Sequence, residues 1–157
     1  MKQAPELRVL MVCLGNICRS PTAEAVLRQR LQAGGLHERI EVDSAGTGAW
    51  HTGAAPDSRS QRHAALRGYD LAGQRARRVV DADFQRFDLI LAMDEDNLAD
   101  LERLEPEGAT AELRLFAAVE VPDPYHGAPQ GFEHVLDLIE QGGDALVIEL
   151  RRRLGTS

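Results

Sequence analysis

Short apolar runs alternate along the chain with longer segments in which apolar residues recur every three or four positions. Apolar runs that are rich in β-branched residues and bounded by glycine, proline or charged residues predict strands. The run over residues 87–93 is nearly continuous, which is typical of a parallel strand buried on both faces of a sheet. Strands are predicted over residues 7–12, 40–45, 87–93 and 113–116, with a further short strand ending at Val79 and Val80.

Segments with helical spacing lie between these runs. In the first one, Ser20 is expected to be the N-cap, Pro21 the first helical residue and Gly34 the end. In the last one, Gly142 and Gly143 interrupt the composition but not the phase, so we predict a single helix, weakened by about 1 kcal/mol per glycine. The alternation of strands and helices predicts an α/β fold with a parallel sheet. Helices are predicted over residues 21–33, 57–67, 94–104 and 132–154, with a loop over residues 121–131.

The composition is typical of one soluble domain. The 157 residues are 43% hydrophobic, enough for one core, and we expect a single domain over residues 1–157. The apolar runs are far shorter than a membrane span, and residues 1–6 lack the features of a signal peptide. Two cysteines, Cys13 and Cys18, lie five positions apart instead of forming a framework of cross-links. We therefore expect no membrane association and a location in the reducing cytoplasm.

The charge and the histidines exclude other classes of partner. The net charge of −7 argues against nucleic acid, whose binding proteins usually present a basic face. It also means that a phosphate site must supply its own donors locally. The five histidines are scattered, and no cluster of histidine and cysteine has metal-ligand spacing, so no metal is expected.

The strongest chemical signal is the segment over residues 13–20, which reads Cys-Leu-Gly-Asn-Ile-Cys-Arg-Ser between the first strand and the first helix. Open α/β folds bind ligands at the carboxyl ends of strands, and a helix N-terminus offers phosphate unpaired N–H groups and a positive dipole end. Gly15 and Asn16 tolerate the left-handed backbone that a tight loop needs. Arg19 can bind two phosphate oxygens with its planar guanidinium.

The same surroundings make Cys13 a candidate nucleophile. A nearby arginine and a helix N-terminus lower a cysteine pKa to about 3.5–7.5, and the Ser20 hydroxyl can donate to the sulfur. A Cys-x5-Arg spacing also arises by chance, and a lone cysteine after an apolar strand is often a core residue. The coincidence with a strand-to-helix turn, a glycine, an asparagine and a Ser-Pro helix start favours catalysis.

Residues 13–24 closely resemble the phosphate loop of the low-molecular-weight protein tyrosine phosphatase family. Further landmarks of the family follow in order along essentially the whole chain: residues 43–47 with Trp50, Pro56 and Asp57, Met93 and Asp94, and residues 123–125. The resemblance implies a four-stranded parallel sheet flanked by helices on both faces. It also implies a phosphate-binding loop between the first strand and the first helix, and a two-step mechanism without cofactor or metal.

The resemblance assigns roles to individual residues. Cys13 would attack phosphorus, Arg19 would clamp the phosphate, and Asp123 would be the general acid and then the general base. By itself, Asp123 followed by Pro124 is equally typical of a turn. The remaining residues expected to bind substrate are Leu14, Gly15, Asn16, Ile17, Cys18 and Ser20 in the loop, with Trp50 and Tyr125 as aromatic walls of a slot.

Several neighbouring residues have two interpretations. Trp50, the only tryptophan, alternatively fills the core, and His51 either contacts substrate or lies solvated in its loop. Many family members carry a second tyrosine where His126 stands, which leaves substrate preference and control by phosphorylation open. Asp94 is expected to orient Arg19, to cap a helix, or both.

Two further predictions concern regulation and recognition. The basic run over residues 75–78 either receives acidic residues of a protein substrate or is a solvated surface. Cys18 either packs behind the loop or condenses with a sulfenic acid formed on Cys13 and so protects it from irreversible oxidation.

Three other functions fit the pattern less well. Thiol-coupled arsenate reductases resemble this fold but use additional cysteines outside the loop, which this chain lacks. Protein arginine phosphatases carry threonine where Ile17 stands, and the isoleucine favours a planar aryl substrate. A phosphotyrosine-binding module with an inactive centre would lack Cys13 or Asp123. We therefore expect tyrosine-phosphorylated proteins as substrates, and we expect the protein to be a monomer. A bacterial-type tyrosine autokinase is suggested as a partner by family analogy alone.

Overall fold

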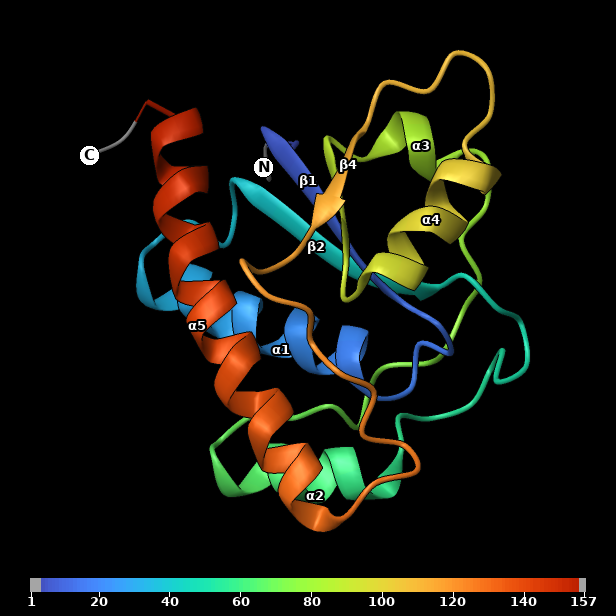
Figure 1. Ribbon diagram of the computed structural model, residues 1–157. Coiled ribbons are helices and arrows are strands. Elements are labelled where there is room, and N and C mark those ends of the chain that lie inside the picture. Colours follow the sequence, from blue (N-terminus) through green and yellow to red (C-terminus); the bar gives the residue numbers. More distant parts are fainter. Residues whose placement is uncertain (1–3, 156–157) are drawn as a thin grey trace.

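Four parallel strands form the central sheet of the computed structural model, which describes residues 4–155 (Figure 1). Strand β1 lies inside the sheet, because it pairs with β2 over all seven of its residues and with β3 over residues 9–12. Its last residue, Cys13, is therefore placed in the middle of the carboxyl edge of the sheet. The strands are β1 (Leu7–Cys13), β2 (Ile40–Gly46), β3 (Leu89–Ala92) and β4 (Glu112–Leu115), in the order β2–β1–β3–β4.

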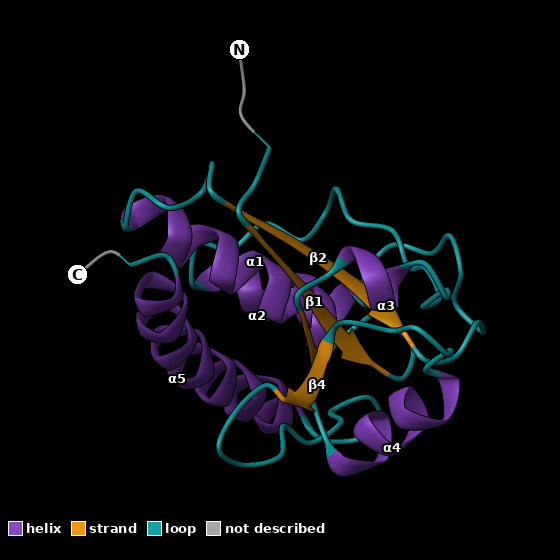
Figure 2. Cartoon of the chain, turned by 90° about the horizontal axis from the view of Figure 1, so that it is seen from above, coloured by secondary structure: helices purple, strands orange, loops and turns teal. Residues whose placement is uncertain are grey.

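Helices cover both faces of the sheet, as the predicted fold class requires. Side chains alternate between the faces of a strand, and Val9 and Met11 of β1 are buried in a core on one face. Leu10 and Val12 are buried in a second core on the other face. Figure 2 shows one group of helices, α1 (Arg19–Ala33), α2 (Ser58–Leu66) and α5 (Pro129–Arg153), on one side, and α3 (Asp83–Arg86) and α4 (Glu95–Leu104) on the other.

The predicted strand ending at Val79 and Val80 is wrong. In the described part of the chain, this segment makes only an isolated bridge between Arg78 and Gly46. Val80 is 55% exposed, and its N–H donates to the carboxylate of Asp83 at 2.9 Å, so the chain turns into α3 there. The sequence did not predict α3, because a helix of four residues is too short for apolar residues to recur at helical spacing.

The last helix confirms the prediction that Gly142 and Gly143 lie in one helix. It begins three residues before the predicted start, since Pro129 takes a first-turn position where proline is favoured. A Cβ at Gly142 would lie 2.8 Å from the Phe116 ring. Gly142 therefore lets the helix lie against the chain just after β4, and Gly143 lets it lie close to Val26 of α1. No helix within residues 4–155, α5 included, has the length and apolarity to cross a membrane.

Candidate active site

The loop between β1 and α1 lies at the carboxyl edge of the sheet, with its backbone N–H groups unpaired among the residues that the structure describes. Its first carbonyls are occupied by the chain after β2, because the Thr47 N–H donates to the Cys13 carbonyl at 3.0 Å and the Gly48 N–H to the Leu14 carbonyl at 2.9 Å. Within residues 4–155, nothing accepts a hydrogen bond from the backbone N–H groups of residues 14–18. These amides, next to a helix N-terminus, are free to bind an anion.

Asn16 fixes the shape of this loop. It has a φ of +56°, in the left-handed region that asparagine tolerates. Its Nδ2 donates to the hydroxyls of Ser20 at 2.9 Å and Ser44 at 3.0 Å, and its Oδ1 accepts from the Arg77 N–H at 3.0 Å. With 3% exposure, the Asn16 side chain is therefore part of the frame behind the loop. A substrate can reach this residue only through its backbone.

Ser20 contacts the candidate nucleophile directly. Its Oγ lies 3.0 Å from Cys13 Sγ. The Ser20 oxygen accepts from Asn16, and its own proton has two acceptors in reach, the sulfur and the more distant Ala45 carbonyl at 3.4 Å. The hydroxyl can therefore donate to the sulfur. This use of the hydroxyl explains why the predicted N-cap role of Ser20 is wrong: α1 begins at Arg19, and the N-cap is Cys18.

Arg19 is a buried cation at the start of α1. Its side chain is held by two hydrogen bonds from Nη1, one of 2.5 Å to Asp94 Oδ2 and one of 3.0 Å to the Val121 carbonyl. Its Nη2 lies 3.7 Å from Asp123 Oδ2. Burial opposes the charge, but the pKa of Arg19 is raised because Cys13 and Asp94 favour the cation. Arg19 thus carries a permanent positive charge beside the sulfur.

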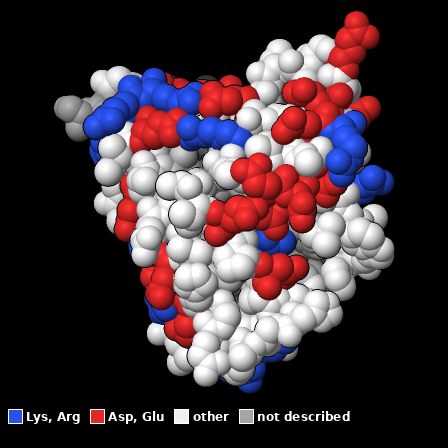
Figure 3. Space-filling view, in the orientation of Figure 1, with Lys and Arg blue, Asp and Glu red and all other residues white. Residues whose placement is uncertain are grey.

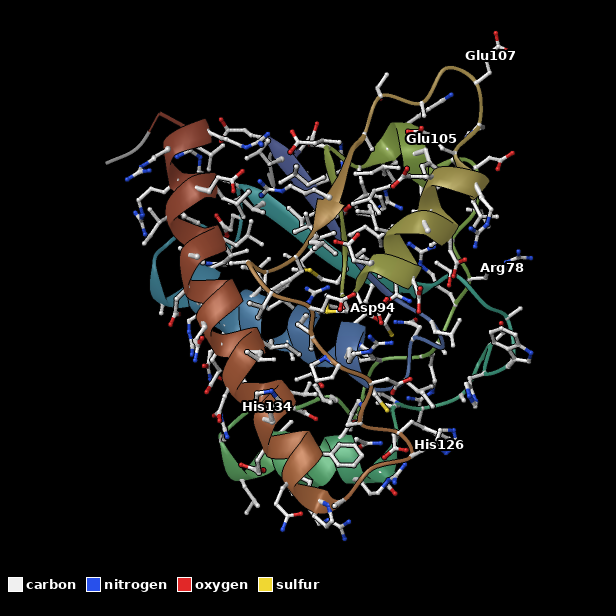
Figure 4. The ribbon with its side chains drawn as sticks, in the orientation of Figure 1. Arg78, Asp94, Glu105, Glu107, His126 and His134 are labelled. Atoms are coloured by element: carbon white, nitrogen blue, oxygen red, sulfur yellow. The ribbon has the colours of Figure 1, made fainter. Side chains whose placement is uncertain are left out.

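Asp94 has both of its predicted contacts. Its Oδ1 accepts from the Asn97 N–H at 2.7 Å and caps α4, while its Oδ2 binds Arg19. Figure 4 shows Asp94 where β3 leads into α4, near the centre of the molecule.

A slot of about 180 Å³ opens above the loop. It brings together Cys13, Arg19 and Asp123, which lie far apart in the sequence. Of the predicted walls, Trp50 is 74% exposed and Tyr125 36% exposed, so Trp50 does not fill the core. Both of these aromatic residues line the slot, and the other lining residues are Leu14, Gly15, Ile17, Cys18, His51 and His126. A larger hollow of about 970 Å³ lies at the opposite, amino end of β2 and contains none of the predicted site residues.

Two histidines belong to the slot. The structure places His51 against Gly15, where a Cβ would lie 2.9 Å from the imidazole Cδ2, so only glycine allows this contact. His126 lines the slot beside Tyr125, with its ring centroid 4.8 Å from the tyrosine ring (Figure 4). In the sequence, the only indication that these histidines belong to the slot is that each directly follows one of the predicted walls, Trp50 or Tyr125.

The basic run over residues 75–78 is only in part a free surface. Arg77 is engaged in ion pairs with Asp43 and Asp83, while Arg75 and Arg78 are exposed. By contrast, acidic side chains gather over the start of α4 and the adjoining loop (Figure 3). The exposed members there are Glu95, Asp96, Glu120 and Asp123. No group of three or more His, Cys, Asp or Glu within residues 4–155 could hold a metal ion.

Comparison with known proteins identifies the family of the chain. Residues 8–155 match the family model described as low molecular weight phosphotyrosine protein phosphatase. The chain belongs to this family. The low molecular weight protein-tyrosine-phosphatase of Streptomyces coelicolor is 41% identical over 157 residues, which cover 94% of this chain and 95% of the relative.

Solved structures agree with this assignment. The protein tyrosine phosphatase from Entamoeba histolytica, crystallised with Hepes in the active site, is 40% identical with a TM-score of 0.88, covering 93% of this chain and 97% of its own. A Drosophila arginine phosphatase is 29% identical with a TM-score of 0.87, covering 92% of this chain and 98% of its own. The resemblance and the fold class predicted from sequence are confirmed, and the protein is an enzyme of the protein-tyrosine-phosphatase class.

Proposed function

We propose that this phosphatase hydrolyses phosphotyrosine in proteins through a phosphocysteine intermediate on Cys13. The observation that carries the proposal is that Cys13, Arg19 and Asp123 line one slot, although 104 residues separate the last two. The slot adds free loop amides for the phosphate and two projecting aromatic side chains for the ring.

In the first step, the Cys13 thiolate attacks phosphorus and forms the S–P bond while the P–O bond to the aryl group breaks. Protonated Asp123 gives its proton to the leaving phenolate oxygen. Arg19 and the loop amides bind the three equatorial oxygens, where negative charge is spread in the transition state. The Ser20 hydroxyl, 3.0 Å from the sulfur, stabilises the thiolate before attack and when it is released.

In the second step, water attacks the phosphocysteine. The Asp123 carboxylate accepts a proton from this water, and the S–P bond breaks to return the thiolate and release inorganic phosphate. Asp123 is suited to both steps because its side chain is 45% exposed, so that substrate and water reach it. The Tyr125 N–H donates to Asp123 Oδ1 at 3.0 Å and orients the carboxylate.

The features of the slot favour an aryl substrate over a phosphoarginine. Ile17 lines the slot where protein arginine phosphatases carry threonine, and Trp50 and Tyr125 offer flat apolar surfaces to a ring. Arsenate reduction is disfavoured, because the chain has no third cysteine to continue the thiol relay. A binding module without activity is disfavoured by the presence of both Cys13 and Asp123.

The cellular setting is inferred from the chemistry. A catalytic thiol needs a reducing compartment, so we place the enzyme in the cytoplasm. Phosphorylated proteins are its substrates in general, and a tyrosine autokinase of bacterial type is our specific candidate. A monomer suffices, because one chain supplies every residue of the slot.

The test is phosphate release from a phosphotyrosyl peptide and from a matched phosphoarginyl peptide, by the wild type and by Cys13→Ser. We expect the wild type to prefer the phosphotyrosyl peptide and Cys13→Ser to release no phosphate from either. A preference for phosphoarginine, or activity without the thiol, would overturn the proposal.

A further inference from the structure

Arg59, in the first turn of α2, joins the wall of the slot to the body of the protein. Its guanidinium carbon lies 5.4 Å from the centroid of the Tyr125 ring and 4.8 Å from the centroid of the Phe132 ring. Tyr125 lines the slot, whereas Phe132 is a buried residue of α5. The lining of the slot does not include Arg59 itself. The guanidinium therefore connects a ring of the slot to a fixed ring behind it.

Asp57 sets the orientation of this guanidinium. Its Oδ2 accepts from Arg59 Nη2 at 2.8 Å, and its Oδ1 accepts from Arg59 Nε at 3.1 Å. Such a two-pronged pair fixes the plane of the guanidinium as well as its position. Asp57 is itself tied to the phosphate loop, since its N–H donates to the Ile17 carbonyl at 2.8 Å. The support of Arg59 thus begins at the loop that binds phosphate.

Phe132 is equally well fixed. Its ring stacks on His63 of α2 with centroids 5.5 Å apart and planes only 6° from parallel. His63 is in turn hydrogen-bonded to Glu133. Arg59 therefore has a rigid partner on its inner side, and the exposed Tyr125 ring is the part of this arrangement that most needs support.

The position of Tyr125 matters for Asp123 as well. The two residues lie in an exposed loop, and the Tyr125 N–H holds Asp123 Oδ1. A shift of the Tyr125 backbone would therefore turn the carboxylate. Cation–π contacts of this kind are strong enough to restrain an exposed side chain.

We propose that Arg59 is a positioning residue for ring recognition: it holds Tyr125 as a wall of the slot and, through the Tyr125 backbone, orients Asp123. The inference rests on the proposed function, because it concerns the ring of an aryl phosphate. It assigns the two parts of the substrate to different supports, with the phosphate held by the loop and Arg19, and the ring held by Tyr125 on Arg59.

The test compares two ligands that differ only in the ring. A non-hydrolysable arylphosphonate and inorganic phosphate are titrated against the wild type, Arg59→Met and Arg59→Lys. We expect Arg59→Met to weaken arylphosphonate binding about five- to tenfold and to leave phosphate within about twofold, the effect expected from lost cation–π contacts. Arg59→Lys keeps the charge beside Asp57 but lacks the flat guanidinium, so its loss is expected to be intermediate. The matched control is Arg62→Met, an exposed arginine on the same helix, which should change neither affinity.

Coupling to the wall is tested with Tyr125→Ala. If Arg59 acts through Tyr125, the double variant Arg59→Met with Tyr125→Ala should bind arylphosphonate no worse than Tyr125→Ala alone. Equal losses for both ligands, additive losses in the double variant, or an unchanged arylphosphonate affinity would each overturn the inference. These experiments measure binding, so they can be interpreted even if the wild type does not hydrolyse phosphotyrosine. A lack of hydrolysis would refute only the proposed function. Melting temperatures identify any variant whose loss comes from unfolding.

Discussion

Asp94 and Arg19 meet across the carboxyl edge of the sheet, with Asp94 Oδ2 only 2.5 Å from Arg19 Nη1. The other oxygen of the same carboxylate caps α4 through the Asn97 N–H. One side chain at the end of β3 therefore starts a helix on one face of the sheet and orients Arg19, the proposed phosphate clamp, on the other. The Arg19 side chain is 3% exposed and that of Asp94 21%, so solvent screens this pair only in part.

Asp94→Asn separates these two roles. Asparagine caps helices about as well as aspartate, so α4 should keep its cap, and any fall in melting temperature should come from the lost ion pair with the buried Arg19. The ion pair with Arg19 is lost, and kcat/KM for an aryl phosphate should fall about 10- to 100-fold, the usual effect of losing a charge-assisted hydrogen bond. The control is Asp96→Asn, an exposed neighbour on α4. Full activity of Asp94→Asn would show that the Val121 carbonyl alone suffices to orient Arg19.

Arg19→Lys should be nearly as inactive as Arg19→Ala. Lysine keeps a charge, but a single ammonium group cannot bind Asp94 and the Val121 carbonyl and still present two donors to phosphate. The measurement is kcat/KM of both variants with the same aryl phosphate. Substantial turnover by the lysine variant would mean that charge alone, without the planar geometry, supports phosphoryl transfer.

Asp123→Asn tests the proton transfer. It should slow hydrolysis of aryl phosphates by about 10² to 10⁴, the usual contribution of general acid catalysis. The loss in the first step should shrink as the pKa of the leaving phenol falls, because a good leaving group departs without a proton. A series of substituted aryl phosphates measures this dependence. If Asp123→Asn slows the hydrolysis of substrates with good and with poor leaving groups equally, Asp123 is not the general acid.

The prediction that Cys18 protects Cys13 is sharpened by the structure. Cys18 lines the slot, but burial raises the pKa of its thiol to about 12, so it is almost wholly protonated at neutral pH. Only the thiolate attacks readily. After peroxide treatment, thiol reductant should restore the wild type more fully than Cys18→Ser, and a Cys13–Cys18 bridge should form faster as the pH rises from about 7 to about 9.

Mass spectrometry of the oxidised wild type measures the bridge, and bound inorganic phosphate is the control, since it should shield Cys13 in both proteins. Equal recovery of the two proteins, or no bridge at either pH, would leave Cys18 with a packing role alone.

Much of this arrangement is local in the sequence and could be predicted from it. The alternation of apolar runs and helical segments determines the α/β class, and the loop motif identifies Cys13 and Arg19 because strand, loop and helix start are contiguous. Asp94 could be named because it follows a buried strand and starts a helix. Even so, the exact start of α1 was missed, since the Ser20 hydroxyl turns to the Cys13 sulfur.

The rest depends on contacts between distant segments. Arg59 lies 66 residues before Tyr125, and nothing in either neighbourhood indicates that the guanidinium reaches the ring. The solvated interpretation of Arg77 fails for the same reason, because its partners, Asp43 and Asp83, lie on other segments. Val79 and Val80 have strand-forming side chains, but pairing, which composition does not determine, is limited to the bridge at Arg78.

The most direct test of the proposed mechanism is to trap phosphate on Cys13. Asp123→Asn is mixed with an aryl phosphate whose leaving phenol has a low pKa, so that the first step stays fast while the loss of the general base slows the second. The reaction is stopped by rapid denaturation, and peptides are analysed by mass spectrometry. The account predicts a phosphoryl group on the peptide that contains residues 13–19. The group should be assigned to Cys13 and should be absent from Cys13→Ser. Hydrolysis without any phosphoenzyme under these conditions, or phosphate on another residue, would contradict it.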